Sequence, residues 1–240
     1  MSAYSDLILA TSGLVGYWRL GEASGLTAAD SSVKGHNATY NGTVTYGQSS
    51  LAPSGDSAVG LLDPSAYVDI PDHADFSGSG GFSIELWFKI ATWDTDGGMV
   101  SRRDSGGNGG FTIQAGSGPN IHFYCYVGGW DTVETAWAVD TAFHAVFTFD
   151  NDKQRVYQNG SLIATGPARG GAITNGGGLR NRIGRNADGS DHPWNGIYDD
   201  VSWYSRALSD AEVAAHYAAL PSGGNANNRF RAFQLRPASQ

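Results

Sequence analysis

The chain has 240 residues and one cysteine, so it is long enough to bury a core but has no internal disulfide to support it. Its 34 glycines and 12% aromatic residues favour short strands joined by tight turns over an all-helical protein. The formal net charge of −8 excludes a general nucleic-acid-binding surface, which needs clustered lysines and arginines.

Alternating apolar residues predict short strands along most of the chain. In the clearest one, 81–90, apolar residues alternate with residues such as Glu85, which therefore lie on the opposite face. Asn159-Gly160 predicts a tight hairpin between two strands. The expected strands cover residues 13–20, 43–46, 66–70, 81–90, 99–102, 110–115, 121–127, 144–149, 154–158, 161–165, 182–184 and 198–204.

One helix is predicted after the last strand. Ser209 followed by Glu212 is a capping-box pattern, and Pro221 ends the segment. Between them runs an apolar stripe at helical spacing, formed by Val213, His216, Tyr217 and Leu220.

The tail after the helix changes character, because three arginines alternate there with apolar residues. One interpretation is a disordered end. The other is an assembly arm that adds a strand to a neighbouring chain by edge pairing. The arm would use Arg229, Phe230, Arg231, Phe233 and Leu235.

Six segments, in order along the chain, form a distinctive set: 14–22 (LVGYWRLGE), 29–38 (ADSSVKGHNA), 67–71 (YVDIP), 156–160 (VYQNG), 183–185 (IGR) and 195–209 (NGIYDDVSWYSRALS). This set resembles the laminin G-like jelly-roll domains of the concanavalin A-like lectin/glucanase superfamily. The resemblance implies an all-β fold: a jelly-roll sandwich of two antiparallel sheets with one short C-terminal helix. We place the jelly roll at 14–220, an N-terminal extension at 1–13 and the tail at 221–240.

The same resemblance implies a structural calcium ion at the edge of the sandwich. The matching segments point to the carboxylates of Asp30 and Asp199 and to loop carbonyls near Gly35 and His36 as ligands. Such hard oxygen donors suit Ca²⁺. The alternative is that Asp30 caps a turn and that Asp199 accepts backbone hydrogen bonds.

Catalysis is not expected, although the superfamily includes glycoside hydrolases, which remain a remote alternative. Retaining hydrolases need two carboxylates roughly 5 Å apart, commonly two residues apart on one strand. The chain has no such string, and Glu85 is the only carboxylate within its strand. Neither a nucleophile elbow nor a phosphate-binding loop is present.

Two functions remain open. A carbohydrate-binding module would present aromatic platforms beside polar groups, and the candidates are Trp130 and Trp137 in a polar segment and Trp93 and Trp194 in other loops. The other function is a structural or decoration subunit of a virus particle, most consistent with a tailed phage, that uses its lectin-like domain to adhere to cell-surface glycans. Its partners would be copies of itself or other virion proteins.

The expected location follows from two absences. No apolar run approaches the ~18 residues of a membrane span, so we expect no membrane insertion. The first residues lack the basic and apolar regions of a signal peptide. We therefore expect a virion protein, or one that becomes extracellular after release.

Overall fold

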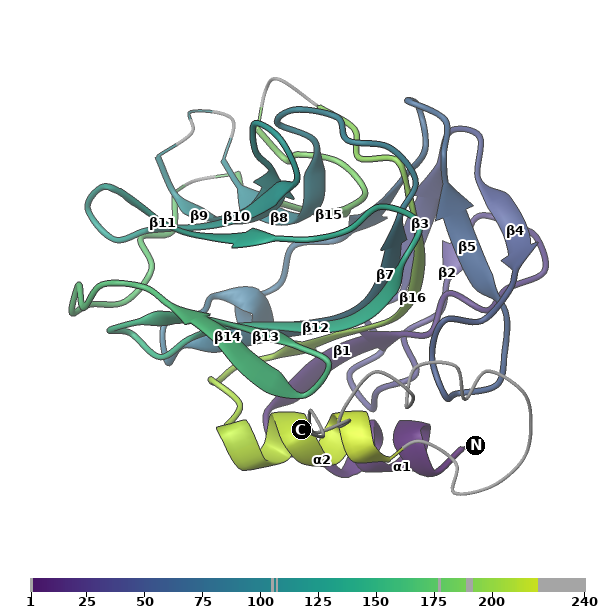
Figure 1. The fold of residues 1–240 in the computed structure, drawn as a ribbon, viewed down its shortest axis with the longest axis horizontal. Helices are drawn as coiled ribbons and strands as arrows, with labels where there is room; N and C mark the ends of the chain where they lie inside the picture. The colour runs from purple at the N-terminus through teal and green to yellow at the C-terminus, as the bar shows by residue number, and fades with distance from the viewer. Residues whose placement is uncertain (1, 105, 107, 177, 189–191, 220–240) are drawn as a thin grey trace, which may run out of the picture.

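Two antiparallel sheets, stacked face to face, form the body of the molecule in the computed structural model (Figure 1). The model describes residues 2–104, 106, 108–176, 178–188 and 192–219. The arrangement confirms the predicted jelly-roll sandwich, with a short helix after the last strand.

We call the first sheet sheet A. Its central pair is β7 with β16, and β1 joins the same side of β16 as β5 but at its other end. In spatial order the strands are β14 (Ser161–Thr165), β13 (Gln154–Gln158), β12 (Ala142–Phe149), β7 (Phe82–Ile90), β16 (Gly196–Tyr204), β5 (Ala58–Leu61) and β4 (Thr45–Gln48), with β1 (Leu14–Trp18) paired to β16.

Sheet B also has eight strands within the described residues. Its order places the four strands between residues 98 and 136 side by side at one end. In spatial order the strands are β11 (Trp130–Ala136), β10 (Asn120–Tyr126), β9 (Gly110–Ala115), β8 (Gly98–Arg103), β15 (Arg180–Ile183), β6 (Tyr67–Ile70), β3 (Ala38–Asn41) and β2 (Thr27–Ala28).

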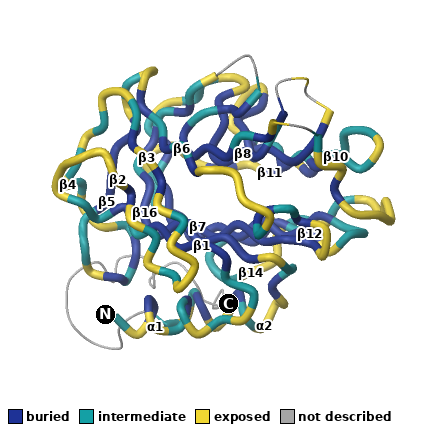
Figure 2. The backbone as a smooth tube through the Cα atoms, turned by 180° about the vertical axis from the view of Figure 1, so that it is seen from behind, coloured by how far each residue is buried: buried dark blue, intermediate teal, exposed yellow. Residues whose placement is uncertain are grey.

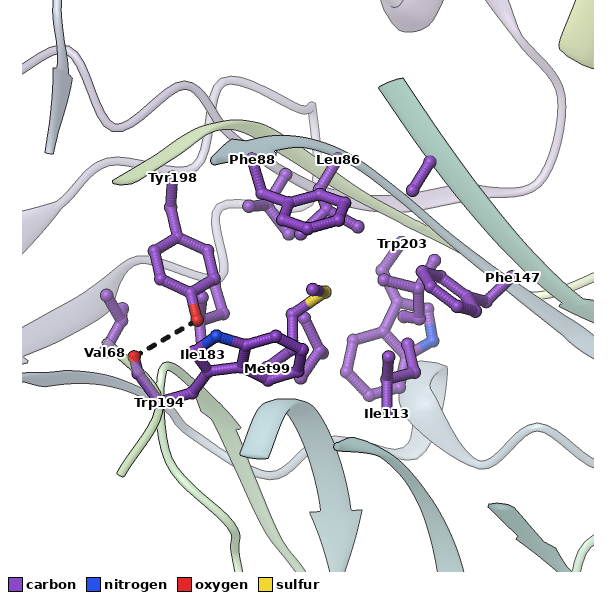
Figure 3. Packing of buried hydrophobic residues seen from close by; sticks show 14 of the residues in the cluster. Val68, Leu86, Phe88, Met99, Ile113, Phe147, Ile183, Trp194, Tyr198 and Trp203 are labelled. Carbon is purple, nitrogen blue, oxygen red and sulfur yellow. Dashed lines mark hydrogen bonds between the residues drawn. The ribbon is translucent and has the colours of Figure 1, made fainter. Parts of the chain in front are cut away.

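The core lies between the two sheets and is rich in aromatic rings (Figure 3). The alternation predicted for β7 is confirmed, because every second side chain from Phe82 to Ile90 belongs to this core, while Glu85 and Trp87 lie on the outer face. The thiol of Cys125 is buried in the same core. Burial raises the pKa of this thiol, as expected for a cysteine that acts as a small apolar residue.

Two α-helices cover the outer face of sheet A (Figures 1 and 2). The predicted helix is α2 (Asp210–Ala218), and its Ser209–Glu212 capping box is confirmed. The other, α1 (Ala3–Ala10), was not predicted and occupies part of the segment assigned to an extension. It packs through Tyr4 and Ile8 against Trp87 of β7. A short 3-10 helix, η1 (Ala74–Phe76), follows β6.

Four strands were not predicted: β2, β3, β5 and β11. The most consequential is β11, because its residues were taken for a polar loop. Val133 and Thr135 point into the sandwich and are buried, whereas Thr132 and Glu134 lie on the opposite face. Polar residues at the outward positions of this edge strand hid its alternation.

Candidate functional site

The outer face of sheet B is not covered by an α-helix in the described part of the chain, since both α-helices there lie against sheet A; we call it the open face (Figure 1). Side chains that alternate with the core residues of β8 to β11 point outward here. Tyr124 pairs with Thr112 on one side and with Thr132 on the other. Trp130 pairs with Tyr126, so aromatic rings gather at this end of the sheet.

A hollow of about 220 Å³ lies on this face. This volume is smaller than the ~300–1,000 Å³ typical of sites for drug-sized ligands. A hollow of this size fits a single sugar ring better than a large cofactor. None of the residues that line it is a carboxylate; they are Arg103, Thr112, Gln114, Tyr124 and Trp130.

Aromatic contacts fix the wall formed by Trp130. Its ring meets Tyr126 edge-to-face at 5.1 Å and Tyr124 at 6.2 Å between ring centroids. The Arg103 guanidinium lies 4.8 Å from the centre of the indole, which is a cation–π distance. These contacts hold the indole in place before any ligand arrives.

Arg103 is positioned by the end of the β8–β9 ladder, where it pairs with Gly110. Gly110 has φ +81, and a Cβ there would overlap the carbonyl oxygen of Arg102, so only glycine fits. The guanidinium also forms an ion pair of 2.7 Å with Asp188. This pairing largely neutralises the positive charge beside the hollow.

Polar groups complete the lining. The Gln114 side chain donates to Asp96 and accepts from Asn186, which holds its amide in one orientation. Two buried atoms, Arg103 Nε and Thr112 Oγ1, have no hydrogen-bond partner among the described residues. A buried polar atom without a partner is costly, and a ligand or an ordered water would relieve that cost.

A second polar site lies on the outer face of sheet A, where Asp56, Asp199 and Asp200 bring carboxylate oxygens within 4.8 Å of one another. One oxygen of Asp199, Oδ2, accepts hydrogen bonds from Ser50 Oγ and from the backbone N–H groups of Leu51 and Ala52.

The other oxygens of the aspartate pair are less well satisfied. Asp200 accepts a hydrogen bond from the Tyr17 hydroxyl at Oδ1. The remaining oxygens, Asp199 Oδ1 and Asp200 Oδ2, are buried and have no hydrogen-bond partner among the described residues. Burial, together with neighbouring carboxylates, raises the pKa of both aspartates above the usual range. Three hard oxygen donors of this kind fit a calcium ion.

A third polar cluster, also on sheet A, surrounds Glu85. His144 Nε2 and His216 Nδ1 each lie 2.8 Å from one of its two carboxylate oxygens. The hydroxyls of Tyr4 and Tyr204 donate to the same carboxylate at 3.3 and 3.1 Å. Burial acts to raise the pKa of Glu85, but the hydrogen bonds from the two histidines outweigh it and hold the pKa at about 2. This network was not predicted, because its members are distant in sequence.

The sequence of residues 61–214 matches the family model described as the concanavalin A-like lectin/glucanases superfamily. The chain belongs to that superfamily. A comparison with curated protein sequences gives no significant match.

Solved structures with the same fold have low sequence identity to this chain. Domain 4 of AbnA, an extracellular arabinanase of Geobacillus stearothermophilus solved with arabinotriose, is 18% identical with a TM-score of 0.69. The alignment covers 85% of this chain and 98% of that domain.

Toxin binding domains are similar too. The binding domain of botulinum neurotoxin serotype G gives 15% identity and a TM-score of 0.67, with 87% of this chain and 51% of that one covered. The binding domain of Paraclostridial Mosquitocidal Protein 1 gives 16% and 0.66, with 85% and 52% covered. The chain therefore spans about half the length of these toxin domains.

The four tryptophans predicted as platforms for a sugar lie in different environments. Trp130 lines the hollow and is partly exposed. The prediction was wrong for Trp137 and Trp194, which are 3% and 1% exposed because they fill the core. Figure 3 shows Trp194 packed there. Trp93 packs against Trp194 at 5.9 Å, away from the residues of the hollow.

The carboxylates of Asp30 and Asp199, predicted to share a calcium ion, do not lie in one cluster in this structure. Both Asp30 oxygens are occupied: Oδ1 accepts from the backbone N–H groups of Tyr17 and Ser32, and Oδ2 from Ser32 Oγ and the His36 N–H. The carbonyl of His36 accepts from the indole of Trp18. Asp30 thus orders the loop around Gly35 by hydrogen bonds, and Asp199 meets Asp56 and Asp200 instead.

A larger depression lies beside the start of α2, with a volume of about 570 Å³. Its charged groups already pair with one another, Arg155 with Asp150 and Arg206 with Glu212. The Tyr157 hydroxyl donates to Asp210. We prefer the hollow on sheet B as the ligand site, because it combines aromatic rings with polar atoms that lack partners.

Two sequence predictions concern other parts of the chain. The five residues of the predicted assembly arm lie outside the described residues. None of the helices in the described part of the chain is long and apolar enough to cross a lipid bilayer.

Proposed function

We propose that this domain binds carbohydrate in the hollow on the open face of sheet B. The observation that carries the proposal is the combination of a held indole, Trp130, with Arg103 Nε and Thr112 Oγ1, two buried polar atoms that lack partners. A sugar ring offers C–H groups to an aromatic face and hydroxyls to polar atoms, so this lining suits both of its surfaces.

The relatives support this class of ligand. The arabinanase domain was solved with arabinotriose, and entry of botulinum neurotoxin type C depends on interaction with two ganglioside molecules. The near-neutral lining, with Arg103 paired to Asp188, favours a neutral sugar over an acidic one. The sugar would be a single ring at the end of a chain, because the hollow holds about 220 Å³.

The test is a glycan array that includes arabinotriose and ganglioside oligosaccharides, followed by titration calorimetry with the best ligand. We expect Trp130→Ala to weaken binding at least tenfold, because it removes the aromatic wall and frees Arg103. Trp93→Ala is the matched control, since Trp93 is a partly buried tryptophan outside the hollow. A domain that binds no glycan, or binds equally well without Trp130, would refute the proposal.

We also propose a structural calcium ion at Asp56, Asp199 and Asp200. These residues would hold the ion through their carboxylates, and it would neutralise the negative charge of the buried Asp199 and Asp200. The support is the pair of buried carboxylate oxygens, Asp199 Oδ1 and Asp200 Oδ2, for which the described part of the chain offers no hydrogen-bond partner. The ion has no part in ligand binding, because the cluster lies on sheet A and the hollow on sheet B.

A role in a virus particle remains a prediction from the sequence. Its assembly arm falls in residues 221–240, outside the described part of the chain. The measurement that decides it is the mass of the full chain in solution compared with that of a chain ending at Pro221. A virion subunit with an assembly arm is expected to lose its oligomers on truncation.

A further inference from the structure

A cluster of two histidines and an aspartate lies where the loop before β3 meets the turn around η1. His36 Nε2 is 3.2 Å from Asp75 Oδ2, and His73 Nδ1 is 3.6 Å from the same oxygen. The two imidazole rings are 4.5 Å apart between centroids. All three donor atoms lie within 4.8 Å of one another.

We propose that His36, His73 and Asp75 form a binding site for a transition-metal ion of the zinc type. Two imidazole nitrogens and one carboxylate oxygen are the donors that Zn²⁺ takes in proteins, whereas Ca²⁺ and Mg²⁺ take oxygen alone. Three protein ligands leave the fourth position to water, as in open zinc sites.

The spacing of the donors supports this metal. Bonds of about 2.0–2.2 Å at tetrahedral angles place neighbouring donor atoms roughly 3.3–3.5 Å apart. The measured separations from Asp75 Oδ2, 3.2 and 3.6 Å, lie on either side of that range. The donor nitrogens of the two histidines lie within 4.8 Å of each other.

The surrounding residues hold His36 in place. Its backbone N–H donates to Asp30, and its carbonyl accepts from the Trp18 indole. Its ring packs on Phe76, which is buried in the main core, at 5.1 Å between centroids. A ligand fixed in this way loses little freedom on binding a metal.

His73 presents Nδ1 towards Asp75. This nitrogen accepts a hydrogen bond from the Asp75 N–H at 3.2 Å, and an incoming ion must replace that donor at its lone pair. The side chain is 52% exposed, and that of Asp75 is 26% exposed, so an ion can reach both from solvent.

The Lys34 ammonium competes with the metal for the Asp75 carboxylate. Lys34 Nζ forms an ion pair of 3.1 Å with Asp75 Oδ2. The lysine side chain is 40% exposed and flexible, so an incoming dication can displace it into water. Protons compete as well, because each histidine must be neutral to bind.

The test is calorimetric titration of Zn²⁺ into the full chain, without a histidine tag, at pH 7.5. We expect one zinc ion per chain, undiminished by an equal concentration of Ca²⁺, and a higher melting temperature with zinc. His73→Ala and Asp75→Asn should each weaken binding at least tenfold. His192→Ala is the control, because His192 is exposed and lies outside the cluster.

Melting of each variant without metal shows whether it folds, and His73→Ala removes a half-exposed side chain, so its fold should be retained. Zinc binding that is absent in the wild type, or that survives both substitutions with unchanged affinity, would overturn the proposal. Binding lost equally in His192→Ala would place the metal elsewhere and would overturn it too.

Discussion

Replacing Glu85 with alanine is expected to lower the free energy of unfolding by about 3–5 kcal/mol, the usual cost of breaking a buried ion pair on one side. The carboxylate is fully buried. It connects β7 to His144 of β12, His216 of α2 and Tyr4 of α1. Its removal leaves all of these polar groups buried without their partner. Chemical denaturation of the two proteins at pH 7 measures the difference.

Two variants make this prediction specific. Glu85→Gln keeps the shape of the side chain and some of its hydrogen bonds but removes the charge. It should therefore lower the free energy of unfolding by less than Glu85→Ala does. Lys89→Ala alters the same face of the same strand at a half-buried position, and its loss should be below about 1 kcal/mol. A loss of less than about 1 kcal/mol for Glu85→Ala would contradict the proposed role of this carboxylate.

The pH dependence of stability follows from the same network. The pKa of Glu85 is about 2 in the folded protein, so its stabilising effect is complete above the unfolded value of ~4.5 and is lost as the pH falls towards 2. The pKa of His216 moves the other way: burial acts to lower it, but the hydrogen bond to Glu85 and its charge raise it. The contribution of His216 is therefore present below the unfolded value and is lost as the pH rises through the folded one. In Glu85→Gln both slopes should be reduced.

Removal of calcium is expected to lower the melting temperature by roughly 5–10 °C at a free calcium concentration near 100 times the dissociation constant. The effect should be larger at pH 8 than at pH 5. Both aspartates have raised pKa values, so without the ion the fold favours their protonated forms and loses stability as the pH rises. The proposed calcium ion would reverse that loss, because it would replace the proton as the neutralising charge. Calorimetric scans with and without chelator at the two pH values measure it.

Substitutions distinguish the two calcium sites that have been considered. Asp56→Asn should abolish the response to chelator, because Asp56 belongs to the cluster around Asp199. Asp30→Asn should retain the response, even if it lowers stability, because both Asp30 oxygens serve hydrogen bonds. A melting temperature that chelator leaves unchanged in the wild type at pH 8 would contradict the proposed calcium site.

Local signals made much of the fold predictable. Two-residue alternation placed β7, Asn159-Gly160 placed the β13–β14 hairpin, and the Ser209–Glu212 pattern placed α2. Helix α1 was missed because eight residues carry little intrinsic helical preference, and its stability comes from packing of Tyr4 and Ile8 on Trp87. Tertiary contacts of that kind do not produce a recognisable apolar periodicity in the sequence of a short segment.

The candidate site was less predictable. Trp130 was identified as a platform even though its segment was taken for a loop. Trp137 directly follows the same strand, but its side chain enters the core. Arg103 and Gln114 become neighbours of Trp130 through the order β8–β9–β10–β11. The sequence has no local feature that encodes this pairing.

The most direct test of carbohydrate binding on sheet B is a nuclear magnetic resonance titration of the tryptophan indole N–H signals with the best glycan from the array. The chain has seven tryptophans, and Trp130→Phe assigns the signal that matters. The signal of Trp130 is expected to shift in proportion to occupancy, while those of the buried Trp194 and Trp203 stay in place. A glycan that shifts Trp93 and leaves Trp130 unchanged, or no shift with any glycan, would contradict the account.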